Sequence, residues 1–219
     1  MLHTAIPHII SPANAPWCGW VMLFLLLCAI MAEVSQPGVI SQVHVSLFAK
    51  SDRTYKESPM NFYGQLFVNL FRIGTLGMAL SACLYAGKPF TFVSYAAVCG
   101  LVLAVWIGKL LCNALINYVF NLRNTIGIAY EHYANITTLA TCCLYLALLV
   151  LVRLASQQML LWTIVVIAIA FIVIWMYRGW KIFVTSPMAI LYLFIYMATL
   201  EVLPLAGLYY LSDKMISIL

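Results

Sequence analysis

Long apolar runs separated by short polar segments fill the chain from residue 17 onward. A helix needs about 20 mostly apolar residues to cross the hydrocarbon core of a bilayer, and six runs meet that requirement. They predict membrane-spanning helices at residues 17–33, 66–86, 90–118, 136–153, 158–177 and 188–211. We therefore expect an all-α fold, a polytopic membrane helical bundle of about six transmembrane helices.

Composition supports a membrane protein rather than a soluble one. Of the 219 residues, 65% are hydrophobic and 8% are charged, whereas a soluble domain has roughly 25% charged residues. The polar segments are too short to bury a core of their own, so residues 1–219 are expected to form a single multi-pass membrane domain. The net charge of +5 comes from scattered basic residues. Scattered charges of this kind argue against nucleic acid as a partner.

The distribution of basic residues predicts how the helices are oriented. Cytoplasmic loops of membrane proteins carry an excess of Lys and Arg. With six spans, one side of the membrane receives Lys50, Arg53, Lys56, Arg123, Arg178 and Lys181, and the other receives Lys88, Arg153 and Lys214. The first side is therefore predicted to be cytoplasmic, with both termini on the outer side.

Residues 39–59 form the longest stretch between predicted spans. Apolar and polar residues interleave in this stretch, which is a candidate cytoplasmic interfacial segment lying along the membrane surface. A solvated loop explains the same pattern equally well, because Val43, Val45 and Leu47 alternate in a way that fits no helix face.

Polar side chains recur at helical spacing inside two of the predicted spans. Lys109, Asn113 and Asn117 are four residues apart in the third span, and Asn69 and Arg72 are three apart in the second. Residues at these spacings share one helix face. Because such a face is untenable against lipid, we expect both stripes to point into the bundle or into a water-filled crevice.

Glu201 is a carboxylate near the middle of the last predicted span, and Pro204 follows it. A charge at this depth costs roughly 2.5–3.5 kcal/mol on insertion scales, so it is usually paired, protonated or turned away from lipid. The rise of 1.5 Å per helical residue places Arg72 and Lys109 within about 5 Å of the same level. We therefore predict an intramembrane polar cluster of Glu201, Lys109, Arg72, Asn113, Asn117 and Asn69 beside Pro204. Two roles fit this cluster: its polar groups link helices to one another, or they form a ligand site.

A weaker candidate site precedes the fourth predicted span, where Glu131 and His132 lie close in sequence to Arg123. A carboxylate, an imidazole and a guanidinium could together bind a ligand. We favour an interfacial helix start instead, because a lone Glu-His pair has no metal-ligand spacing and Glu131 would suit a helix amino terminus.

Signatures of catalysis are missing from the sequence. It contains no His-Glu-x-x-His, Gly-x-Ser-x-Gly or Gly-x-x-x-x-Gly-Lys motif, so zinc proteolysis, serine hydrolysis and P-loop nucleotide chemistry lack support. The four His residues fall outside the predicted spans, and the seven Cys residues show no ligand spacing. We expect no metal and no cofactor, and enzymatic activity is not favoured.

The closing stretch carries a family resemblance. A tyrosine-rich helix from Tyr192 to Tyr196 runs into Thr199-Leu200-Glu201 and then Pro204. This pattern is similar to the carboxy-terminal signature of an uncharacterised bacterial family of integral membrane proteins, domain of unknown function 4271. The resemblance implies several spans in the cytoplasmic (inner) membrane of a bacterium and assigns no reaction.

Two functions fit these features. The first is a non-enzymatic structural or accessory subunit of a membrane or envelope assembly, with membrane lipids and other membrane proteins, or a second copy of itself, as partners. The second is a small transporter or channel for a proton, an ion or an anionic lipid-like ligand. It would use Glu201, Lys109 and Arg72 as its site.

Overall fold

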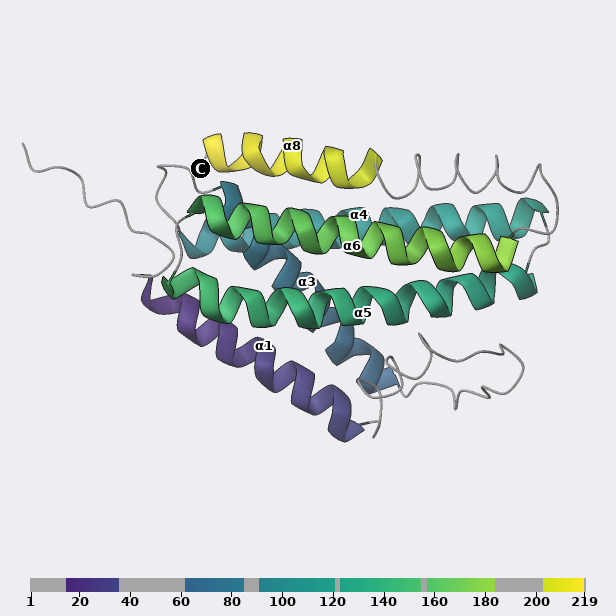
Figure 1. Cartoon of the computed structure of the whole chain (residues 1–219), viewed down its shortest axis with the longest axis horizontal. Coiled ribbons are helices and arrows are strands. Elements are labelled where there is room, and N and C mark those ends of the chain that lie inside the picture. The colour runs from purple at the N-terminus through teal and green to yellow at the C-terminus, as the bar shows by residue number, and fades with distance from the viewer. Residues whose placement is uncertain are drawn as a thin grey trace, which may run out of the picture.

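The computed structural model describes residues 15–35, 62–84, 91–120, 123–154, 157–183 and 203–218. Within these ranges every regular element is a helix, so the all-α prediction is confirmed. The helices are α1 (Pro16–Ser35), α3 (Phe62–Leu84), α4 (Phe92–Phe120), α5 (Arg123–Leu154), α6 (Gln157–Phe183) and α8 (Leu203–Ile218). They pack side by side as an elongated bundle (Figure 1).

Five of these helices contain a stretch long and apolar enough to cross a membrane. These stretches are Pro16–Ser35, Phe62–Leu84, Phe92–Cys112, Tyr133–Val150 and Gln158–Tyr177. The sixth predicted span, 188–211, lies partly outside the described residues, as does all of segment 39–59. The described bundle confirms a helical membrane fold, while the sixth span and the orientation in the membrane stay predictions.

The apolar stretch of α5, Tyr133–Val150, agrees with the predicted fourth span, but the helix extends well before it. Helix α5 begins at Arg123 rather than near residue 136, so the polar residues that precede the apolar run are helical and do not form a long loop. The chain has no proline between Pro89 and Pro187, and hence no residue there that forbids a helix. Polar residues such as those of 123–135 can continue a helix beyond the hydrocarbon, where water solvates their side chains.

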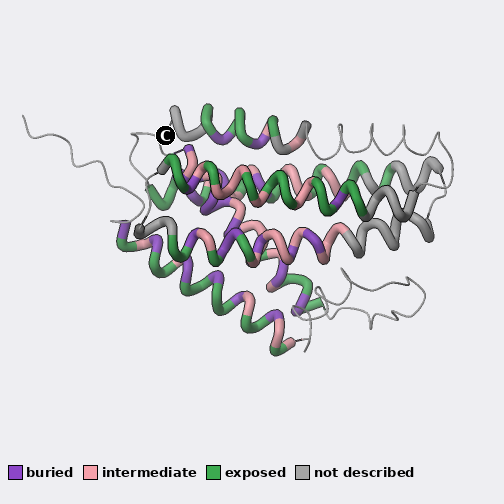
Figure 2. The backbone as a smooth tube through the Cα atoms, in the orientation of Figure 1, coloured by how far each residue is buried: buried purple, intermediate pink, exposed green. Residues whose placement is uncertain are grey.

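Helix α3 is the centre of the bundle, because it contacts all five of the other described helices. Half of the apolar stretch of α3 is buried, whereas only 11% of the apolar stretch of α6 is buried. Figure 2 shows this difference as buried segments along α3 and mostly exposed ones along α6. The tightest part of the core joins Leu25 of α1, Met78 of α3 and Leu148 of α5, none of which is more than 1% exposed.

Two glycines allow the close approach of helices to α3. A Cβ on Gly74 would lie 2.4 Å from Leu25 Cδ2, and one on Gly77 would lie 2.4 Å from Cys99 Sγ. Both distances are shorter than van der Waals contact, so only glycine fits without rearrangement. Small residues serve membrane bundles in this way because packing, rather than exclusion of water, holds the helices together.

Tyrosine hydroxyls add two hydrogen bonds between helices. The Tyr95 hydroxyl of α4 donates to the Gly74 carbonyl at 3.3 Å, and the Tyr145 hydroxyl of α5 donates to the Met22 carbonyl of α1 at 2.9 Å. Each places a polar group of one helix against the backbone of another. One bond joins α4 to α3, and the other joins α5 to α1.

Candidate intramembrane cation site

Arg72 is the eleventh of the 23 residues of α3 and lies about halfway along a membrane-spanning helix. Its side chain reaches α5, where Nη2 donates to the Ala134 carbonyl at 2.7 Å and Nε donates to Thr138 Oγ1 at 3.2 Å. Nη2 also donates to Thr138 Oγ1, and Nη1 donates to Asn69 Oδ1 at 3.2 Å. All three guanidinium nitrogens therefore bond to α3 or α5. We call Asn69, Arg72, Ala134 and Thr138 the Arg72 anchor.

Thr138 is suited to this contact by its own hydrogen bond. Its hydroxyl donates to the Ala134 carbonyl at 2.8 Å, one turn earlier in α5, and this leaves its oxygen lone pairs to accept from Arg72. Thr138 is only 4% exposed. A guanidinium enclosed in this way has exchanged water for fixed acceptors, which offsets much of the cost of burying its charge.

Lys109 of α4 approaches the same part of α5 through an aromatic ring. Its Nζ lies 3.5 Å from the centroid of the Tyr133 ring, which is cation–π geometry. The Tyr133 ring in turn packs edge-on against Phe171 and Trp175 of α6, with centroid distances of 6.0 and 5.2 Å. We call Lys109, Tyr133, Phe171 and Trp175 the Tyr133 cluster. It joins three helices around one ring.

The two cations thus approach consecutive residues of α5: Lys109 lies over Tyr133, and Arg72 bonds to the Ala134 carbonyl. Glu201, the predicted third member, lies outside the described residues, so its convergence with the two cations stays a prediction. The structure gives the backbone of Asn113 and Asn117 in α4 but not their side chains. Pro204 is the second described residue of α8.

Sequence reasoning did not identify Thr138 or the Ala134 carbonyl as partners of Arg72. A signal for Thr138 exists, because Thr137, Thr138 and Thr141 place three hydroxyls within two turns of an otherwise apolar run. Each of the three donates to a carbonyl of its own helix at 2.7–2.8 Å. The Ala134 carbonyl carries no such signal, because a backbone acceptor has no residue type.

The weaker candidate, Arg123, Glu131 and His132, lies on the first three turns of α5, and the structure does not describe these side chains. Arg123 is the first residue of the helix. Our preferred interpretation of Glu131 as part of a helix start is therefore wrong, because the helix amino terminus, where a carboxylate is stabilised, lies two turns earlier. Whether the three residues form a site stays untested.

The fold and the two partly buried cations define the chain as a polytopic membrane helical bundle with ionisable groups held between its helices. The chain belongs to the family described as Domain of unknown function (DUF4271), which matches residues 19–211. This match confirms the resemblance seen in the carboxy-terminal motif. No curated protein and no solved structure matches the chain.

Proposed function

We propose that the chain is a non-enzymatic integral membrane protein that acts as a structural or accessory subunit of a larger membrane or envelope assembly. The observation that carries the proposal is the Arg72 anchor, in which every guanidinium nitrogen is bonded to α3 or α5. A charge used in this way holds helices in register. The cytoplasmic membrane of a bacterium, implied by the family resemblance, is part of the proposal.

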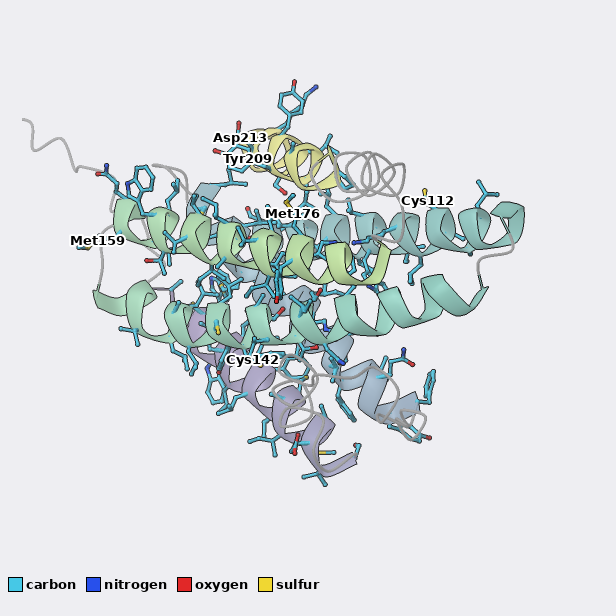
Figure 3. The ribbon with its side chains drawn as sticks, turned by 45° about the vertical axis from the view of Figure 1, so that its right-hand side comes forward. Cys112, Cys142, Met159, Met176, Tyr209 and Asp213 are labelled. Carbon is cyan, nitrogen blue, oxygen red and sulfur yellow. The ribbon has the colours of Figure 1, made fainter. Side chains whose placement is uncertain are left out.

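The outward faces of the bundle support the same proposal. The described helix α6 exposes a row of apolar side chains spaced three and four residues apart, a spacing that suits packing against another helix. The row consists of Met159, Trp162, Val166, Ile169, Val173 and Met176, which are 43–62% exposed. Figure 3 shows Met159, near one end of α6, pointing away from the bundle. Lipid would cover this face as readily as a partner protein, so an experiment has to distinguish them.

Photo-crosslinking in native membranes makes this distinction. A photoreactive amino acid at Val166, which is 62% exposed, should yield one defined cross-linked protein. The same residue placed at Trp20 of α1, which is 73% exposed, provides the control for random collisions. Cross-links to lipid alone from every exposed helix face would contradict an accessory role.

A second candidate function is a small transporter or channel for a proton, an ion or an anionic lipid-like ligand. The approach of Lys109 and Arg72 to consecutive residues of α5 favours it, because ionisable groups within membranes often mark ion pathways. Substitution of Lys109, Arg72 and Glu201 by uncharged residues should then abolish flux into proteoliposomes. Flux that survives all three substitutions would exclude this candidate.

A further inference from the structure

We draw no further inference here: the strongest candidate, the outward face of α4 from Ala96 to Gly108, where alanine and glycine alternate at every fourth residue, carries none because nothing in the structure shows what covers it.

Discussion

An arginine within a bilayer costs about 2.5–3.5 kcal/mol on insertion scales when nothing compensates for it. Arg72 is compensated by Asn69 on its own helix and by Ala134 and Thr138 on α5. The sequence predicted that Arg72 shares a face with Asn69, because spacing alone determines that relation. It could not predict Thr138, since the pairing of two helices depends on how they cross. The contact between Arg72 and α5 is therefore information that only the folded bundle contains.

A double-mutant cycle measures this contact. Arg72→Met keeps the apolar stem and removes the donors, and Thr138→Val removes the acceptor at nearly constant volume. We expect the pair to show a coupling of about 1 kcal/mol in the free energy of unfolding, in the range found for hydrogen bonds between membrane helices. Unfolding would be followed in mixed micelles as the fraction of denaturing detergent rises.

Thr163 of α6 provides the control for this cycle. Its hydroxyl donates at 2.9 Å to the Met159 carbonyl one turn earlier in α6. This is the same bond that Thr138 makes to Ala134 in α5. Thr163→Val should therefore show no coupling to Arg72→Met. Equal coupling for both threonines would mean that Arg72 acts on the whole bundle rather than through α5.

At the scale of the elements, the apolar runs predicted where helices cross the membrane and most helix ends, but not the start of α5 or the end of α6. The described ends of α1, α3 and α4 lie within a few residues of the predicted ones, because apolar runs there are bounded by proline, glycine or charge. Helix α5 extends well beyond its apolar run, because hydropathy reports contact with lipid and not helicity. The sequence likewise could not predict how α3 packs against α4, because no sequence pattern indicates which glycine faces which helix.

Gly77→Ala should reveal how closely α3 and α4 approach. The added methyl group would lie 2.4 Å from Cys99 Sγ, and the required rearrangement should destabilise the bundle by about 1–3 kcal/mol. The double variant Gly77→Ala with Cys99→Ala should recover much of this loss, because the clashing sulfur is removed. Thermal unfolding in detergent provides the measurement.

Gly100 on α4 is the matched control, since a Cβ there meets nothing within 4 Å. Gly100→Ala should be neutral or stabilising by up to about 1 kcal/mol, because alanine favours a helix. Similar losses from Gly77→Ala and Gly100→Ala would show that the α3–α4 contact does not depend on the absence of a side chain.

At the scale of the whole molecule, the described helices alternate in direction. Helices α1, α4 and α6 run one way, and α3, α5 and α8 run the other, as the colours of Figure 1 show. The bundle thus begins and ends on the same side. Together with the excess of basic residues at the opposite end, this arrangement supports the prediction that both termini face outward.

Reporter fusions test this orientation. A carboxy-terminal fusion to alkaline phosphatase, which is active only outside the cytoplasm, should be active, and a fusion to green fluorescent protein at the same site should be dark. A second pair of fusions between α5 and α6, at residue 155, should behave like the terminal pair, because both sites are predicted to be external. Fluorescence from the carboxy-terminal fusion would reverse the orientation.

We propose that this member of the DUF4271 family is a membrane bundle whose partly buried cations hold helices together and whose outer faces meet a partner. The mass of the particle extracted from native membranes in a gentle detergent tests that claim most directly. We expect the chain to leave the membrane in a complex with a second membrane protein or with another copy of itself, and we expect Arg72→Met to reduce the yield of that complex. A particle that is always a single chain with bound lipid, in the original protein and in the variant alike, would contradict it.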